Sequence, residues 1–401
     1  MSAVKYFHAQ QAGSPTLTGI QGSLISVLDA CLVNGFGLKS VESIVVAGNI
    51  ATVTVSTGHA MEPDILALIE GATPSGLNGE KRVLSSTATT FTFAAAGISD
   101  LTASGTITTK VAPLGWEKVF SATHKAVYRP SSVEGTRMFL RVDETVDGRE
   151  ARVRGFEHMT DVDTGVGAFP TTDQLVTGAL WPKASVANAN QRDWTIIGDH
   201  RTLYLHLNCV DSVSSSTGFR LSGSVWTFGD FKSFKAADPY ACLLQGATST
   251  GQYGSGSGQD QSVEFVRTDN NGNPGQVVPR NYTGVSGASQ VIRHAESLMS
   301  GNGAVSGSGA YYVYPNGPDN GLLLVGTQLI EYLSGNAHLR GRTRGVYRVP
   351  QNCHASFAQR TKIDGTGDLT GRKLLAIKCG SPNSASSQAV LFFDITGPWE
   401  A

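Results

Sequence analysis

Short runs of alternating apolar and polar residues, separated by glycine-containing turns, recur along this chain and constrain its fold more than any other feature. Val53 and Val55 alternate with threonine and serine, and Leu203, Leu205 and Leu207 alternate with threonine, tyrosine and histidine. Such alternation places the apolar side chains on one face of a β-strand. Glycine, at 47 of 401 residues, supplies the turns between strands. The pattern predicts a mainly β protein.

Turn signals between these runs predict antiparallel pairing. Gly48-Asn49, Asp147-Gly148 and Gly198-Asp199 each lie between two strand-like segments, as in a β-hairpin. We therefore expect a small β-sandwich-like module and a larger antiparallel β-sandwich or barrel region, with one or two short helices.

The length and the spacing of these patterns suggest three parts. Residues 1–40 form an N-terminal segment with a docking helix, 41–112 a small all-β module, and 113–401 a larger β-rich domain. The stretch 246–287 is rich in glycine, serine and turn-forming residues, so a further division there stays open. It is also our candidate for an adaptable contact loop.

One segment has helical rather than strand periodicity. Between Ser23 and Val33, apolar residues recur at helical spacing and include Leu24, Leu28 and Leu32. Asn34-Gly35 then provides a left-handed end. Since a short helix with one apolar stripe needs something to pack on, we expect these three leucines to anchor the chain to a neighbouring protein. A second short helix is expected within 289–299.

Composition excludes several classes of protein. Lys+Arg 31 and Asp+Glu 32 leave a formal net charge of −1, whereas nucleic-acid binders carry an excess of basic residues. Apolar runs are too short for a membrane-spanning helix, and the first residues lack the apolar core of a secretory signal. The five cysteines are widely spaced, as expected of reduced buried thiols. We expect no nucleic-acid partner, no membrane span and no cofactor.

Common catalytic motifs are missing from the sequence. No serine has glycine at both ±2, no Gly-Lys dipeptide is present, and neither His-Glu-x-x-His nor Cys-x-x-Cys occurs. These absences argue against several hydrolase, nucleotide-binding and zinc-enzyme classes. They do not address polysaccharide lyases or depolymerases, because paired carboxylates are recognised only in three dimensions. We assign no catalytic and no metal-binding residue.

Two groups of residues, one with histidines and one with aspartates, are candidates for metal sites. His200 and His206, next to Asp199, are about 20 Å apart along a straight strand, too far to share one ion. Asp161-Val162-Asp163-Thr164-Gly165 resembles the start of a calcium loop but lacks the later carboxylates. We favour a turn and a surface position for the histidines, and an Asx-turn for the aspartates.

The basic cluster Arg340-Gly341-Arg342-Thr343-Arg344 is the most conspicuous charge run. In a strand, Arg340, Arg342 and Arg344 share one face. We expect that face to be solvated or to lie at a subunit interface, rather than to contact phosphate.

Two stretches resemble proteins of tailed bacteriophages. In the first, a strand ends at Gly58-His59, the next at Gly71-Ala72, and an Asn78-Gly79 turn precedes the strand Thr90-Phe91-Thr92-Phe93. This order resembles the small β module of phage tail and fibre proteins. The second stretch, from Gly115-Trp116 to Gly165 together with 226–231, is similar to structural proteins encoded in phage tail gene clusters.

The resemblance implies a non-enzymatic structural component of a tailed-phage virion, in the tail or baseplate. Such a protein is made in the bacterial cytoplasm and incorporated in the virion, as a homo-oligomer with contacts to other virion proteins. Two alternatives stay open. One is a capsid decoration or head-fibre protein; the other is a tail protein that binds host-surface glycan or degrades polysaccharide.

Overall fold

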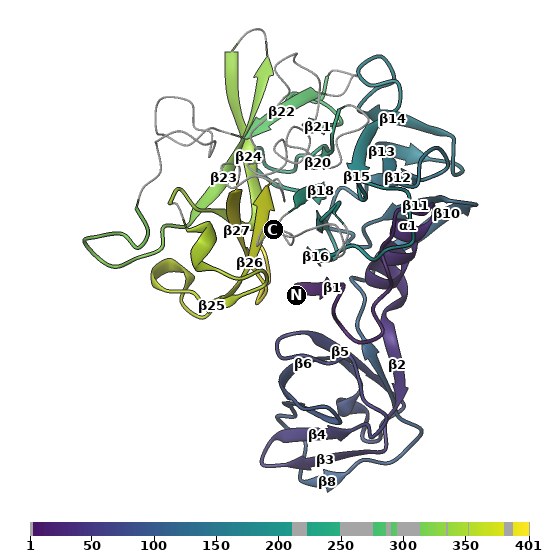
Figure 1. Cartoon of the computed structure of the whole chain (residues 1–401), viewed down its shortest axis with the longest axis vertical. Helices are drawn as coiled ribbons and strands as arrows, with labels where there is room; N and C mark the ends of the chain where they lie inside the picture. The colour runs from purple at the N-terminus through teal and green to yellow at the C-terminus, as the bar shows by residue number, and fades with distance from the viewer. Residues whose placement is uncertain are drawn as a thin grey trace.

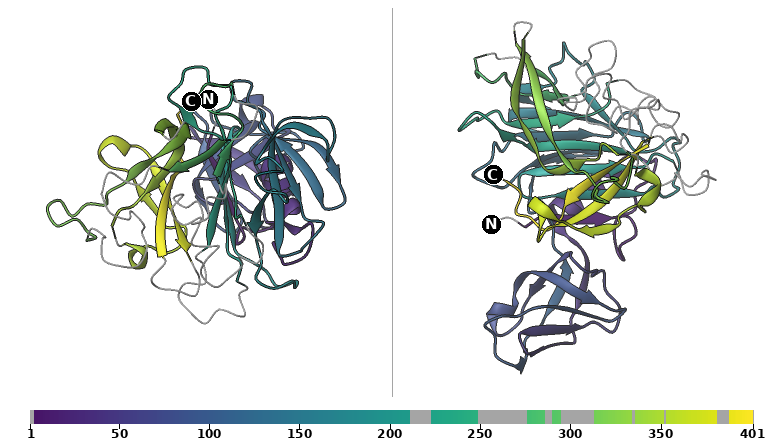
Figure 2. Two further views of the ribbon diagram at one scale, coloured as in Figure 1. Left: turned by 90° about the horizontal axis from the view of Figure 1, so that it is seen from above. Right: turned by 90° about the vertical axis from the view of Figure 1, so that its left-hand side faces the viewer.

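A computed structural model describes residues 3–210, 223–248, 276–285, 290–294, 313–333, 336–351, 353–380 and 388–400. The protein is mainly β, as the alternating patterns predict, and its described strands form three antiparallel sheets. A small lobe, the module, projects from one end of a larger body (Figures 1 and 2). None of the helices in the described ranges has the length and apolarity to cross a membrane.

The module is an eight-stranded sheet in the order β2-β9-β5-β6-β7-β4-β3-β8. Its strands are β2 Phe36–Ser40, β3 Ser43–Ala47, β4 Ile50–Thr54, β5 Leu66–Glu70, β6 Gly79–Ser86, β7 Thr90–Ala94, β8 Leu101–Thr102 and β9 Thr108–Val111. A 3₁₀ turn, η2, spans Ser75–Leu77. The module thus includes β2, which lies before residue 41.

Local sequence explains the module's first hairpin. Gly48 and Asn49 both adopt positive φ, at 57° and 65°, which is the geometry of a type I′ turn. The following strand pairs in register, with Val45 opposite Thr52. The predicted hairpin is confirmed.

The body contains a six-stranded sheet built around the order β10-β11-β12-β13-β14, with β15 also paired to β13. These strands are β10 Glu117–Ala122, β11 Lys125–Arg129, β12 Phe139–Asp143, β13 Glu150–Met159, β14 Gly165–Phe169 and β15 Ala179–Pro182. The hairpin predicted around Asp147-Gly148 is present as the β12–β13 pair.

The rest of the body is a thirteen-stranded sheet that curls into a half-barrel. Its first half contains β1 Lys5–His8, β16 Trp194–Gly198, β17 Thr202–Leu207, β18 Ser224–Asp230, β19 Lys232–Ser233, β20 Cys242–Gln245 and β21 Gln276–Val278. Its second half contains β22 Gln290–His294, β23 Val325–Leu333, β24 Asn336–Arg348, β25 Lys362–Asp364, β26 Lys373–Gly380 and β27 Gln388–Asp394. Two 3₁₀ turns, η3 His354–Ser356 and η4 Gly367–Leu369, lie between strands.

Curling buries both faces of the central strand β17. Phe228, which is paired with Leu203, contacts Phe169 of the six-stranded sheet at a centroid distance of 6.3 Å. On the opposite face, Tyr204 contacts Phe393 at 5.2 Å. Every residue of β17 is therefore buried, and the body consists of three packed layers.

Two expectations about the second half of the chain have different outcomes. The helix expected within 289–299 is wrong for residues 290–294, which form strand β22, paired with β21 and β23. Most of the glycine- and serine-rich stretch 246–287, including its tract at 251–258, lies outside the described residues.

Candidate functional site

The leucines predicted to anchor the chain to a neighbour are buried within the chain itself. Leu24, Leu28 and Leu32 are each 0% exposed. They lie on α1 Ser23–Leu28 and on its π-helical continuation η1 Asp29–Asn34, which ends at Gly35 with φ +73°. The predicted helix is confirmed, but the partner of its apolar stripe is the body of the same molecule. These leucines cannot form an intersubunit contact.

A buried ion pair fixes the start of this helix. Lys183 and Glu144 are fully buried, and the lysine Nζ lies 2.6 Å from Glu144 Oε1. Glu144 Oε2 accepts a hydrogen bond from the backbone N–H of Ile25 at 2.9 Å. Lys183 Nζ also donates to the carbonyl of Ile20 and to Ser23 Oγ. The pair ties the helix to strands β12 and β15.

The basic cluster on β24 is also turned inward, contrary to the solvated or intersubunit face that we expected for it. Arg340 is buried and pairs with Glu331 at 3.0 Å and Asp238 at 2.8 Å. Arg344 is buried and pairs with Asp199 at 2.8 Å. The expectation is wrong for these two arginines because carboxylates from strand β23 and from two turns of the chain neutralise them.

Arg342, between them, is the exposed member of the cluster. Its side chain is 42% exposed and pairs with Glu400, itself 61% exposed. A single such pair near the surface contributes little to stability. The cluster is thus two internal ion-pair centres flanking one surface residue.

The structure does not bring the candidate metal ligands together. The ring of His206 donates from Nε2 to the carbonyl of Lys378 at 3.1 Å, and its Nδ1 faces the amide of Gln359 at 3.5 Å. Both ring nitrogens are therefore engaged by the chain. The surface position that we favoured for His206 is wrong, because the residue is buried. In the described ranges, no group of three or more histidine, cysteine, aspartate or glutamate side chains is arranged to hold a metal ion.

The aspartate-rich loop is an Asx-turn, as we favoured. Asp161 Oδ1 accepts the backbone N–H groups of Asp163 and Thr164, both at 2.8 Å. Asp163 is paired with Lys125 and Arg141. The carboxylate of Asp163, which a calcium ion would need as a free ligand, is therefore already paired with cations of the chain itself.

Burial of His206 predicts acid sensitivity. Burial lowers its pKa from 6.5 to about 4, so the unfolded chain binds this proton more readily than the folded one. The stability contribution is complete above pH 6.5 and is lost as the pH falls toward 4, by about 3 kcal/mol. We expect His206→Gln to flatten the stability profile in this window, measured by urea unfolding at each pH. The exposed His158→Gln is the control, and an equal slope in both variants would contradict the prediction.

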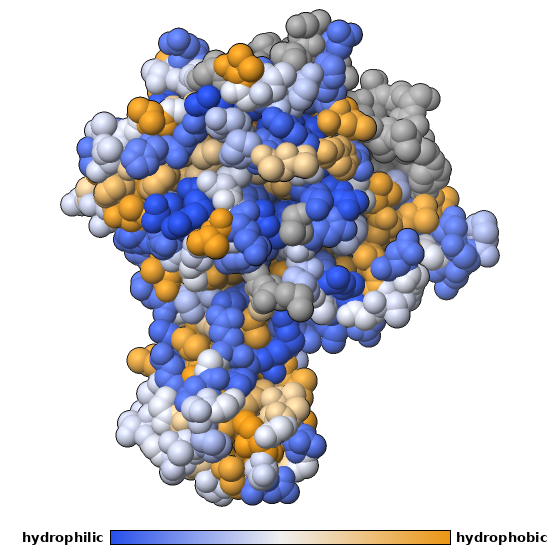
Figure 3. Space-filling model, turned by 180° about the vertical axis from the view of Figure 1, so that it is seen from behind, coloured by the Kyte–Doolittle hydropathy of each residue, from blue (hydrophilic) through white to orange (hydrophobic). Residues whose placement is uncertain are grey.

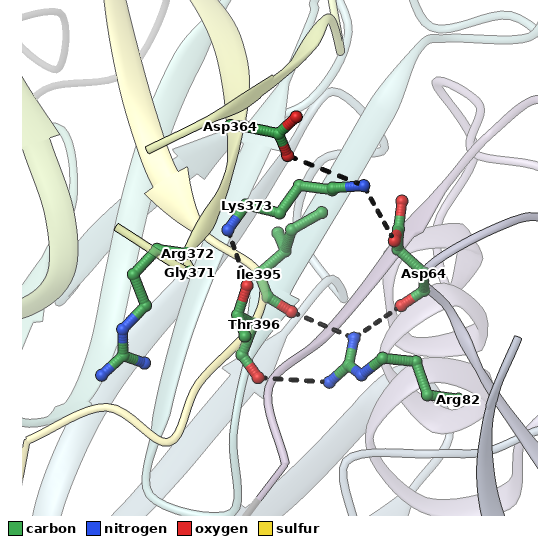
Figure 4. Close-up of a pocket in the computed structure, with 8 residues that line it drawn as sticks. All are labelled: Asp64, Arg82, Asp364, Gly371, Arg372, Lys373, Ile395 and Thr396. Atoms are coloured by element: carbon green, nitrogen blue, oxygen red, sulfur yellow. Dashed lines mark hydrogen bonds and ion pairs between the residues drawn. The ribbon is translucent and has the colours of Figure 1, made fainter. Parts of the chain in front are cut away.

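A cleft of about 310 Å³ lies where the module meets the body. Figure 4 shows the lining residues Asp64 and Arg82 from the module, and Asp364, Gly371, Arg372, Lys373, Ile395 and Thr396 from the body. Arg82 donates to the carbonyls of Asp64 at 2.7 Å, Ile395 at 3.2 Å and Thr396 at 3.3 Å. Burial is the main cause that lowers its pKa. The guanidinium therefore joins the two lobes, and the cleft is an interdomain contact.

The module also has an outer sheet face without charge. All of the module lies within the described residues, and the outward positions of β3, β4, β7 and β8 hold no ionisable side chain. One row across the sheet runs Thr102, Val45, Thr52, Thr92 and Ser85. Two more rows contain Ser43, Thr54 and Thr90, and Ala47, Ile50 and Ala94. The opposite face is buried apolar core.

Comparison with known proteins adds no assignment. No protein-family model matches this chain, and no curated protein matches its sequence.

Sequence reasoning missed both surfaces for different reasons. At the junction that contains the cleft, Asp64 pairs with Lys362, which lies 298 residues away, and no local pattern signals such a contact. The outer face had a signal in the alternation of Val53 and Val55 with Thr52 and Thr54. That alternation identifies the buried side of the sheet, and the same alternation leaves only uncharged residues on the other side.

Proposed function

We propose that this chain is a non-enzymatic structural component of a tailed-bacteriophage virion, in its tail or baseplate, that acts by self-association and by contacts to other virion proteins. The sequence resemblance of the stretches at 53–93 and 115–165 supports the phage context. The observation that carries the assembly role is the uncharged outer face of the module.

Exposed faces of antiparallel sheets usually carry charged side chains, which keep molecules apart. Here the outward positions hold threonine, serine, alanine and β-branched apolar residues, including Val45 at 42% exposed and Ile50 at 38%. Much of the small lobe is correspondingly pale or orange in Figure 3, and deeper blue gathers where it meets the body. An uncharged face can pack on an identical face without like-charge repulsion. A second copy of this chain is therefore the occupant that we propose.

Charges placed on this face should prevent self-association. We expect Val45→Lys with Ala94→Lys to convert an oligomer to a monomer in sedimentation velocity, because both side chains point outward and their charges would be buried between copies. Strand content by circular dichroism should be unchanged. The matched control, Val166→Lys with Ala122→Lys, places the same charges on exposed positions of the six-stranded sheet.

Two results would count against this surface. One is a parent protein that sediments as a monomer at every concentration tested. The other is a charged variant that assembles as the parent does.

The position in the particle needs a separate experiment. Antibody raised against the chain, applied to phage particles and viewed by negative-stain electron microscopy, should decorate the tail or baseplate. Decoration of the head would favour the capsid alternative, and unlabelled particles would overturn the virion assignment.

A further inference from the structure

The module and the body meet through surfaces of opposite charge. The contact includes residues from three body strands and from two places in the module. On the module side the carboxylates are Glu62, Asp64 and Glu80. On the body side the facing groups are the cations Lys5, Lys362 and Lys373 and the imidazole ring of His8.

Asp64 is the centre of this contact. Its Oδ2 lies 2.9 Å from Nζ of Lys362, and its Oδ1 lies 3.5 Å from Nζ of Lys373. Figure 4 shows Lys373 reaching across the cleft toward this carboxylate, with Asp364 on its other side. One module carboxylate thus contacts two body lysines.

The flanking pairs use strand β1. His8 Nε2 lies 3.1 Å from Glu62 Oε2, and Lys5 pairs with Glu80. The hydroxyl of Tyr6, between them, donates to the carbonyl of Pro63 at 3.0 Å. Contacts from β1 therefore extend the charged surface to Glu62 and Glu80.

Several of these groups remain open to water. The side chains of Lys5 and His8 are 6% and 9% exposed, whereas those of Glu62, Glu80 and Lys373 are 38%, 41% and 39% exposed. Pairs with such access to solvent are weak individually and are screened by salt. The contacts of Arg82 across the junction are also long, at 3.2 to 3.4 Å, and end on neutral carbonyls.

Two covalent connections join the lobes, and they lie side by side. The chain enters the module after Gly35 and leaves it after Val111, and Val111 is paired with Phe36. Gly35 has φ +73°, and a Cβ there would lie 2.4 Å from the carbonyl oxygen of Val111. The ring of Phe7 packs on Phe36 at this same place. These two adjacent connections lie at one edge of the junction, where buried apolar residues of the two lobes belong to one continuous cluster, and they form a pivot there.

We propose that the ion pairs Asp64–Lys362, Asp64–Lys373 and Glu80–Lys5, together with the Glu62–His8 contact, form an electrostatic latch, and that the module swings as a rigid unit about the Gly35–Val111 pivot when the latch is released. The motion is independent of the proposed virion role, because it depends only on contacts inside one chain. Relative motion between lobes of one chain is the ordinary expectation unless their interface is large and hydrophobic.

The latch is tested by distance measurements on the full chain. Dyes on Ala88→Cys in the module and Val133→Cys in the body report the separation of the lobes by energy transfer. Both positions are exposed, and Ala88 lies in the turn between β6 and β7, outside the uncharged face. The five native thiols are buried, and burial raises the pKa of Cys31 and Cys242. The dyes should therefore react at the introduced thiols.

We expect transfer efficiency to change as salt rises from about 50 mM to about 1 M, together with an increase in the radius of gyration from small-angle X-ray scattering. The latch variant Glu62→Gln, Asp64→Asn and Glu80→Gln should already give the high-salt values at low salt. The control variant Asp161→Asn, Asp163→Asn and Asp319→Asn removes the same charge away from the junction and should behave as the parent.

Circular dichroism is the check that each variant keeps its strand content. A folded latch variant with the parent's transfer efficiency and radius at every salt concentration would overturn the proposal. If the latch variant does not fold, the salt series on the parent protein is the test. A transfer efficiency and a radius of gyration that do not change with salt would then contradict the latch.

Discussion

Lys183→Met is expected to lower the free energy of unfolding by about 3–5 kcal/mol, because it leaves the Glu144 carboxylate buried without its partner. Lys183 and Glu144 are each 0% exposed. The same change removes the donor to the carbonyl of Ile20 and to Ser23 Oγ. Urea unfolding followed by tryptophan fluorescence measures the loss.

Two further variants separate the buried charge from loss of packing. Lys183→Met combined with Glu144→Leu removes both charges and should recover part of the lost stability, since uncharged side chains of similar size often replace buried pairs. Lys125→Met breaks a surface pair with Asp163 and should cost less than about 1 kcal/mol. Equal losses for Lys183→Met and Lys125→Met would show that the buried pair does not stabilise the fold.

Arg340→Met is expected to have an effect of similar size, about 3–5 kcal/mol, because it leaves two buried carboxylates unpaired. Arg340 Nη1 contacts Glu331 and its Nη2 contacts Asp238. Glu331 also accepts the backbone N–H of Tyr282 at 2.7 Å, so the network connects β23 and β24 to the segment after β21. The same unfolding assay measures the change.

The chain provides its own control two residues away. Arg342→Met removes an exposed pair with Glu400 and should change stability by less than about 1 kcal/mol. If the two substitutions have the same effect, the internal network around Arg340 is not a stabilising element.

Turns and helices whose conformation depends on neighbouring residues can be predicted from the sequence. Two residues with positive φ make the Gly48-Asn49 turn, and helical spacing with a following glycine makes the helix that begins at Ser23. The alternation of Leu203, Leu205 and Leu207 with polar residues correctly predicts strand β17. Its polar face, with Tyr204 and His206, is nevertheless buried, because a remote part of the curled sheet covers it.

The predictions are wrong where a residue's contact partner is distant in the sequence. Leu24, Leu28 and Leu32 form a stripe that needs a partner, but the sequence does not reveal that the partner is intramolecular. The arginines 340 and 344 look like a surface run because their carboxylates, such as Asp199, are not neighbours in sequence. Contacts of the Asp64–Lys362 kind depend on the assembled fold, and a single sequence carries no record of them.

The paired entry and exit of the module have a consequence for protein engineering. Because Phe36 and Val111 lie opposite each other in adjacent strands, the whole intervening segment behaves as a cassette whose ends are already joined in space. A short loop in its place would close the gap without rerouting the backbone, and a different β domain with neighbouring termini could be grafted onto the same two stubs.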